Sequence, residues 1–161
     1  MDFELTEEQR MIKETVYKWS VQELGPLQEK IDEEDWFPPD FFEKCADIGI
    51  LGITMDEKYG GLGGDVLMQA LAIEEMSRIC PALAMSYGAH SNLCANNIHK
   101  NGSEEHKRKY LPDLTAGTRI TKASTPVVHP WWMRALAASS QGTTLPSLVT
   151  WTAGCAEAIR R

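Results

Sequence analysis

Signals that begin and end helices recur along the first 120 residues, and they restrict the fold more than any other feature of the sequence. Thr6 and Gln9 have the spacing of a capping box, in which each side chain bonds to the other residue's backbone N–H and begins a helix. Apolar residues then recur every three to four positions until Gly25-Pro26, where we expect the helix to stop. The pattern predicts an all-α, up-and-down helical bundle for residues 1–120.

We expect five or six helices in this bundle. After the first, apolar spacing and flanking breakers predict helices over Leu27 to about Asp35, Phe41 to Ile48, Val66 to about Arg78, Pro81 to Asn101, and Glu104 to Leu111. Asp65 and Ser103 are the expected N-caps of two of these, and Gly49 is expected to end another in a left-handed conformation. Glu74 and Arg78, four residues apart, are expected to form an ion pair.

The composition changes near Ile120. Residues 1–120 contain 22 acidic and 12 basic residues, whereas residues 121–161 contain one acidic residue, Glu157, and four basic residues. The second segment also has ten Ser or Thr residues and no sustained helical or strand period. We therefore predict one domain over 1–120 and an atypical, loosely packed or disordered tail over 121–161.

Charge and composition exclude several classes of function. The net charge of -7 argues against nucleic acids and anionic membranes as partners. No apolar run is long enough to span a membrane, and the N-terminus is acidic where leader peptides are basic, so we expect a cytoplasmic protein. The cysteines form no CxxC pair and are expected to be reduced and packed; they are Cys45, Cys80, Cys94 and Cys155.

Two motifs suggest ligand sites, and their spacing argues against both. The glycine-rich stretch 60–64 lacks the third glycine of a dinucleotide loop, because Val66 occupies that position, and Asp65 would repel a phosphate. His90 and Cys94 are one helical turn apart, but a closed zinc site needs four convergent ligands, so we expect no metal site.

The segment from Pro81 to Gly102 carries the most informative pattern. It is rich in Ala, Gly and Ser, and Met85, Ala89 and Leu93 are spaced i, i+4, i+8 along one helix face. Such a wall of small residues serves either as helix–helix core or as one side of a ligand pocket, and the pattern alone leaves both interpretations open.

Five short segments, in their order and spacing, resemble the N-terminal helical domain of acyl-CoA dehydrogenases. They are Leu5-Thr6-Glu7-Glu8-Gln9, Ile50-Leu51-Gly52-Ile53, Tyr59-Gly60-Gly61, Glu74-Glu75-Met76-Ser77-Arg78, and Asn101-Gly102 through Lys109-Tyr110-Leu111-Pro112. The stretch from Ser86 to Cys94 is similar to the isovaleryl-CoA dehydrogenase branch, whose substrates are short branched acyl thioesters.

The resemblance implies the chemistry of the complete enzyme. FAD would accept a hydride from the acyl-CoA substrate after a glutamate removes the α-proton, and electron-transfer flavoprotein would take the electrons. The enzyme would be a homo-oligomer. In this family the matching helix lines the acyl-chain cavity, so the expected pocket residues are Met85, Ser86, Ala89 and Leu93.

The resemblance ends near Ile120. The family continues with a flavin-contacting stretch of the form Thr-Glu-Pro-x-Ala-Gly-Ser-Asp, whereas this chain reads Thr121-Lys122-Ala123-Ser124-Thr125-Pro126. A frameshift, a genuine alternative tail and an unrelated small module would each explain the difference. We favour the frameshift, because codons permitted for Lys122 to Val128 can spell Ser-Glu-His-Ala-Gly-Ser in the neighbouring frame.

The chain therefore lacks the parts on which the family's chemistry depends. The catalytic base and most flavin contacts belong to later domains, so no catalytic residue is assigned, the cofactor-binding residues are unknown, and the chain alone is expected to be inactive. The alternative is a non-enzymatic helical interaction module, in which the wall around Gly88 packs against a partner helix.

Overall fold

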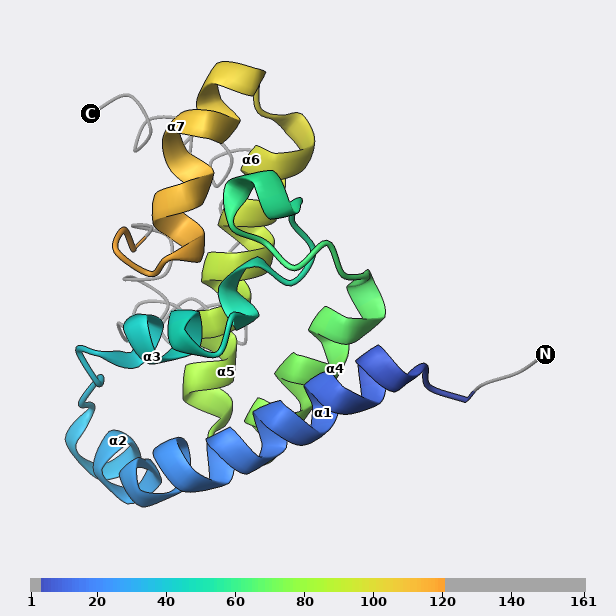
Figure 1. Ribbon diagram of the computed structural model, residues 1–161. Coiled ribbons are helices and arrows are strands. Elements are labelled where there is room, and N and C mark those ends of the chain that lie inside the picture. Colours follow the sequence, from blue (N-terminus) through green and yellow to red (C-terminus); the bar gives the residue numbers. More distant parts are fainter. Residues whose placement is uncertain (1–3, 121–161) are drawn as a thin grey trace, which may run out of the picture.

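The computed structural model of the protein describes residues 4–120, and all regular structure in that range is helical. The helices are α1 (Glu7–Trp19), α2 (Gln28–Glu34), α3 (Phe41–Asp47), α4 (Val66–Ser77), α5 (Pro81–Gly88), α6 (Asn96–Asn101) and α7 (Glu104–Thr115). Helical turns of other types join α1 to α2 and α5 to α6, so α1 to α7 form five continuous helical runs (Figure 1). Two single 3-10 turns, Ile50–Gly52 and Glu57–Tyr59, lie between α3 and α4. The all-α bundle predicted from the sequence is confirmed. The predicted tail and Cys155 lie outside the described residues.

The cap of α1 is the one that the sequence predicts. The Gln9 N–H donates to Thr6 Oγ1 at 3.2 Å, and the Thr6 N–H donates to Gln9 Oε1 at 3.0 Å. The expected stop at Gly25-Pro26 is wrong, because Gly25 keeps helical angles (φ -52°, ψ -47°) and the chain continues through Gly25–Leu27 into α2. A proline in the first turn of a helical segment costs little, since its missing N–H has no partner there.

The last helix also runs further than predicted, because Pro112 lies inside α7 and not beyond it. A proline in a helix interior costs about 3 kcal/mol. Leu114 and Thr115, in the turn after the proline, are both buried, and burying one leucine side chain returns about 1.5–3 kcal/mol. The Thr115 hydroxyl also donates to Tyr59 O at 2.9 Å, and this bond joins the end of α7 to the connection between α3 and α4.

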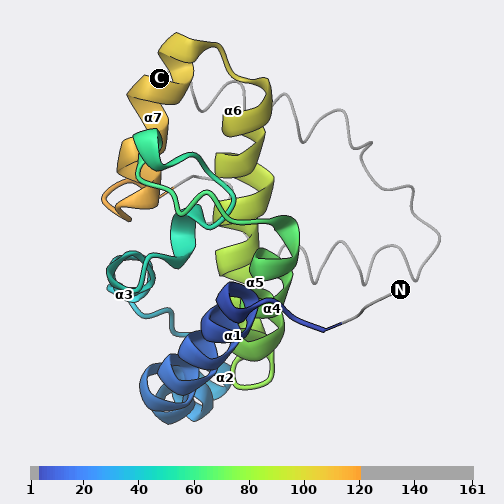
Figure 2. The same ribbon diagram turned by 45° about the vertical axis from the view of Figure 1, so that its right-hand side comes forward.

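The helices alternate in direction after α3. Figures 1 and 2 show α4 running one way, the α5–α6 run returning, and α7 reversing again. Helix α1 packs on α4 and runs parallel to it, since contacts succeed one another in the same order along both: Gln9 with Asp65, Lys13 with Glu75, and Tyr17 with Arg78. The long connection 35–64 permits this parallel arrangement.

One buried charge links α1 and α4. Glu75 is 1% exposed, and its carboxylate lies 3.0 Å from the Arg78 guanidinium and 3.5 Å from Lys13 Nζ. The expected pairing of Arg78 with Glu74 is therefore wrong. Glu75 faces α1, and a buried carboxylate needs a cation more than an exposed one does.

The core consists of two clusters. The larger unites α1, α3, α4 and α5 around Phe41, Phe42 and Tyr87, and the smaller lies between α7 and the loop that carries Tyr59. The segment 50–55 supplies residues to both clusters. Gly49 has a φ of 75°, as predicted for the residue that ends α3. Within residues 4–120, no helix combines the length and apolar character needed to cross a lipid bilayer.

Candidate functional site

The α5–α6 run carries the predicted pocket residues, and it is not a plain α-helix. Pro81 occupies the first turn of α5, where its missing N–H costs nothing. Between α5 and α6 the chain forms a π-helical segment, Ala89–Ala95, called here the wide turn, in which the Asn96 N–H donates to Ser91 O five residues earlier. Such turns are rare and often occur at functional sites. A second π-helical segment, Ser20–Leu24, follows α1, but only the α5–α6 run combines such a turn with the predicted pocket residues, which makes this run the candidate site.

The structure separates the four predicted pocket residues into two pairs. Ser86 and Ala89 are buried, whereas Met85 is 56% exposed and Leu93 is 46% exposed. The Ser86 hydroxyl donates to Ala82 O at 3.1 Å, so its polar group is satisfied within the helix. Two apolar side chains thus lie at the surface beside two small buried ones, and their contact with an acyl chain stays a prediction.

Part of the small-residue wall is core of this domain. A Cβ atom added at Gly88 would lie 3.8 Å from Ile73 Cδ1 of α4, which is an ordinary van der Waals contact. Helix α4 therefore packs against the wall at Gly88. This arrangement disfavours the alternative in which a foreign helix packs at that glycine.

Tyr87 anchors the same run from its buried side. Its hydroxyl donates to Ile50 O at 2.8 Å, and the side chain is fully buried. Burial raises the pKa of Tyr87 well above its ordinary value, so the phenol remains a proton donor at neutral pH. No local sequence pattern predicts this bond, because its partners are 37 residues apart.

His90 lies in the wide turn and reaches a third helix. Its Nε2 atom is 3.0 Å from Leu114 O, and its ring packs against Phe42 with 4.9 Å between ring centroids. A carbonyl oxygen only accepts, so Nε2 carries the proton in this bond. Burial lowers the pKa of His90, which the bond to Leu114 partly offsets, and the imidazole is therefore neutral at pH 7.

His90 and Cys94 do not converge with further ligands. Among residues 4–120, no group of three or more His, Cys, Asp or Glu side chains could hold a metal ion. Cys45, Cys80 and Cys94 are all buried, and burial raises the pKa of the Cys45 and Cys80 thiols. Both of these thiols are therefore protonated and poorly nucleophilic at neutral pH.

The glycine-rich loop uses its own amides internally. The N–H groups of residues 61–64 donate to the backbone oxygens of Asp56, Gly52, Met55 and Ile53 at 2.7–3.2 Å. The Asp65 carboxylate accepts from the Met68 N–H at 2.7 Å and caps α4, as predicted. This geometry agrees with the spacing argument against a phosphate loop.

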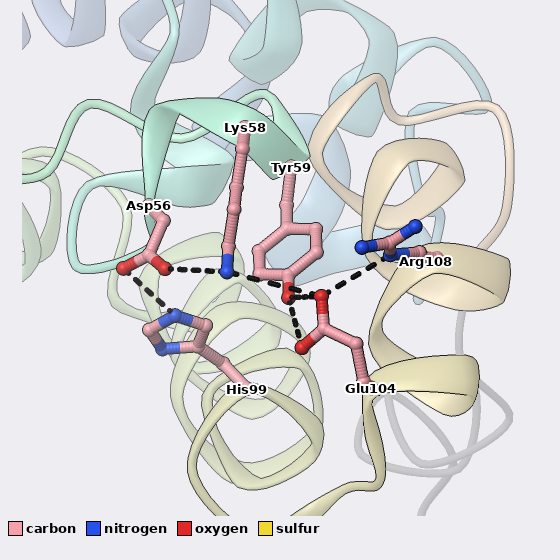
Figure 3. A network of polar contacts seen from close by, with 6 residues as sticks. All are labelled: Asp56, Lys58, Tyr59, His99, Glu104 and Arg108. Carbon is pink, nitrogen blue, oxygen red and sulfur yellow. Dashed lines mark hydrogen bonds and ion pairs between the residues drawn. The ribbon is translucent and has the colours of Figure 1, made fainter.

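A network of polar side chains joins the glycine-rich loop to α6 and α7. Figure 3 shows its members: Asp56, Lys58, Tyr59, His99, Glu104 and Arg108. The Tyr59 hydroxyl lies 2.9 Å from both oxygens of Glu104, and His99 Nε2 is 3.2 Å from Asp56 Oδ1. Hydrogen bonds from Tyr59 and Arg108 lower the pKa of Glu104. Glu104 is thus an ionised anchor for the loop and lacks the raised pKa of a general acid.

Comparison with known proteins identifies the fold. Residues 6–118 match the family described as Acyl-CoA dehydrogenase, N-terminal domain. The chain is 40% identical over 120 residues to the short-chain specific acyl-CoA dehydrogenase of Clostridium acetobutylicum, covering 74% of this chain and 32% of that protein. It is 43% identical over 118 residues to the mitochondrial isovaleryl-CoA dehydrogenase of Bos taurus, covering 72% and 28%. The chain thus spans less than a third of the length of either relative.

Solved structures give the same result. Butyryl-CoA dehydrogenase from Megasphaera elsdenii superposes with a TM-score of 0.71 at 33% identity, covering 74% of this chain and 32% of that chain. The electron transferring flavoprotein structure from Acidaminococcus fermentans contains a chain that matches with a TM-score of 0.72 at 38% identity over the same shares. The acyl-CoA dehydrogenase of Bacillus anthracis, solved with FAD, matches with a TM-score of 0.67 at 32% identity, covering 73% and 20%. The chain belongs to the acyl-CoA dehydrogenase family, and residues 6–118 are its N-terminal domain.

Proposed function

We propose that this chain supplies the acyl-pocket helices of a flavin-dependent acyl-CoA dehydrogenase that oxidises short or branched acyl-CoA thioesters to trans-2-enoyl-CoA. The observation that carries the proposal is the family match over residues 6–118, which includes nearly every residue that the structure describes. The similarity to both a short-chain and an isovaleryl-CoA dehydrogenase supports a short or branched acyl group.

The pocket would be built from both pairs of residues on the α5–α6 run. Ser86 and Ala89 are small and buried, so they would leave space for an acyl chain without exposing polar groups to it. Met85 and Leu93 present apolar side chains at the surface. An acyl chain, or the remainder of a longer enzyme, would remove these two side chains from water, and burial of each apolar group would be favourable.

On this proposal the described residues do not form a flavin site by themselves. The loop that could offer consecutive amides to a pyrophosphate uses those amides for its own backbone hydrogen bonds. FAD would therefore be held by the part of the enzyme that corresponds to the remaining length of the relatives. On this proposal the 161-residue chain alone binds no FAD stoichiometrically and is inactive, and electron-transfer flavoprotein is a partner of the complete enzyme only.

A chimera tests the pocket assignment. Residues 6–118 would replace the matching segment of the Bos taurus isovaleryl-CoA dehydrogenase, and kcat/KM would be measured with propionyl-, butyryl- and isovaleryl-CoA. Ala89→Leu should lower kcat/KM for the larger substrates by about one to two decades, because overpacking of this size costs about 1–3 kcal/mol. The propionyl-CoA value should change least.

Ala84→Leu is the matched control, because Ala84 is a buried alanine of the same helical run but was not assigned to the pocket. It should lower the melting temperature and affect all three substrates alike. If Ala89→Leu gives that same uniform loss, Ala89 is helix–helix core and not a pocket residue. A chimera that binds no flavin and turns over no acyl-CoA, although folded, would favour the interaction-module alternative.

A further inference from the structure

His90 joins three elements that are distant in the sequence. It lies on the wide turn, its ring packs against Phe42 of α3, and its Nε2–H donates to Leu114 O of α7. Leu114 is in the last turn of α7, and its carbonyl oxygen also accepts from the Gly117 N–H at 3.4 Å, so the His90 bond adds a second donor at this helix end. The imidazole is completely buried, and its Nδ1 atom has no hydrogen-bond partner among the described residues, so the bond to Leu114 O is the one that its ring nitrogens make there.

Contacts of this kind can stabilise the wide turn. A π-helical turn holds one residue more than an α-helical turn and is intrinsically rare, so neighbouring structure must hold it open. His90 is its second residue, and Ala89, His90 and Ser91 are consecutively buried. Because successive side chains of a helix point in different directions, burial of all three shows that more than one element encloses this part of the run, as the contacts of His90 with α3 and α7 also show.

The extra residue changes the direction of every side chain that follows it. Relative to an uninterrupted α-helix, residues beyond the turn are rotated by about one residue step, roughly 100°. Leu93 lies near the end of the turn and Met85 lies before it. The angle between these two exposed apolar side chains therefore depends on whether the wide turn is present.

We propose that His90 is a positioning residue, whose bond to Leu114 O holds the wide turn open and thereby sets the direction of Leu93 relative to Met85. The consequence for an acyl pocket rests on the function proposed above, whereas the control of the turn by His90 does not. The proposal assigns to His90 no contact with a substrate.

The chain offers matched variants for a test. His90→Gln keeps an amide N–H donor at a comparable reach, whereas His90→Phe keeps a ring to pack against Phe42 but removes the donor. Tyr87→Phe is the control, because it removes the buried hydrogen bond to Ile50 O from the same helical run and leaves the bond from His90 to Leu114 O in place; the Tyr87 hydroxyl also lies beside Ser91 of the wide turn. All four proteins would be compared as the full 161-residue chain by residue-resolved amide hydrogen exchange.

The amides of residues 93–96 should report the wide turn, and those of residues 84–87 should report α5. In His90→Phe, exchange of the first set should accelerate about tenfold more than exchange of the second, as expected when a buried hydrogen bond is lost locally. His90→Gln should restore the wild-type ratio between the two sets. Tyr87→Phe should accelerate the second set at least as much as the first.

Three results would overturn the proposal: unchanged protection of residues 93–96 in His90→Phe, no restoration by His90→Gln, or the same local pattern in Tyr87→Phe. If His90→Phe does not fold, long-range ¹H–¹⁵N correlation of the wild-type imidazole decides, because a proton on Nδ1 in place of Nε2 would also overturn it. None of these measurements depends on flavin or activity, so failure of the proposed function would leave them interpretable.

Discussion

Gly61 provides the sharpest test of how the glycine-rich loop is built. A Cβ atom at this position would lie 2.2 Å from Met55 O and 2.5 Å from Met55 C, both backbone atoms that cannot rotate away. To relieve the overlap in Gly61→Ala, the loop must move by about 1 Å. Such a shift strains the neighbouring bonds from the Gly63 and Gly64 N–H groups to Met55 O and Ile53 O, each 2.7 Å long.

The expected loss follows from these two effects. Overpacking against well-packed neighbours costs about 1–3 kcal/mol. One weakened backbone hydrogen bond adds about 0.5–1.5 kcal/mol. Gly61→Ala should therefore lower the free energy of unfolding by about 3 kcal/mol, which corresponds to a drop in Tm of about 10 °C for a domain of this size.

Gly63→Ala is the matched control in the same loop. Gly63 has a φ of +65°, but nothing lies within 4 Å of its added Cβ. The substitution should cost only the conformational penalty of a left-handed alanine, about 1 kcal/mol. The free energy of unfolding of both variants would be measured by urea unfolding at pH 7, with one m-value shared by all proteins in the fit. Equal losses, or a larger loss for Gly63→Ala, would refute the argument that backbone contact requires glycine at position 61.

Three further predictions concern titratable side chains. Burial lowers the pKa of His90 below its ordinary value of 6.5, so as the pH falls the unfolded chain takes up this proton before the folded chain does. The contribution of neutral His90 to the free energy of unfolding should therefore be fully present above pH 6.5 and decrease below it. His90→Gln should reduce the change of this free energy with pH, measured by urea unfolding from pH 8 to 5. Hydrogen bonds from the Met68 N–H and then from the Gln9 amide lower the pKa of Asp65, so the stability that its carboxylate contributes should be present above pH 3.8 and be lost as the pH falls through the lower pKa of the folded state. At pH 7, Asp65→Ala should lower the free energy of unfolding by about 1–2 kcal/mol, whereas Asp65→Asn should retain most of the cap. Glu75→Gln should lower the free energy of unfolding by about 2 kcal/mol, measured by thermal or urea unfolding. A double-mutant cycle with Lys13→Met should give a coupling energy of only about 0.5–1 kcal/mol, because Lys13 is 38% exposed. A coupling energy near zero would show that Arg78 alone neutralises the carboxylate.

The features predictable from the sequence are those that depend on a few neighbouring residues. The caps at Thr6, Asp65 and Ser103 each join a side chain to an N–H three residues later, and all three are confirmed. The left-handed Gly49 is equally local, since only its own backbone angles decide it. Such features can be predicted from the sequence because the residues that form them are close together along the chain.

The errors and omissions share the opposite property. Pro112 is tolerated in α7 because the residues after it, Leu114 and Thr115, are buried against other parts of the domain. Arg78 pairs with Glu75, whose buried carboxylate faces α1. The bonds from Tyr87 and His90 join residues 37 and 24 positions apart. None of these leaves a periodic trace in the sequence, because each depends on which helices pack together.

The candidate site was accordingly predicted in part. The resemblance selected the correct family and the helical run that carries the four pocket residues. Spacing alone suggested that Met85, Ala89 and Leu93 are equivalent, whereas the structure buries Ala89 and exposes the other two. The wide turn between them was not foreseen, since no residue type is specific for it.

The wide turn also has an evolutionary consequence. A helix that already contains one surplus residue can lose it, or an ordinary helix can gain one, while the segments on either side keep their own packing. Relatives of this domain that differ by a single insertion or deletion within residues 89–95 would then keep the same bundle and present a different side chain beyond the turn. Among such relatives, the count of residues between two positions on this helix would be a poor guide to whether they face the same ligand, and a one-residue change in length would redirect a side chain as a substitution cannot.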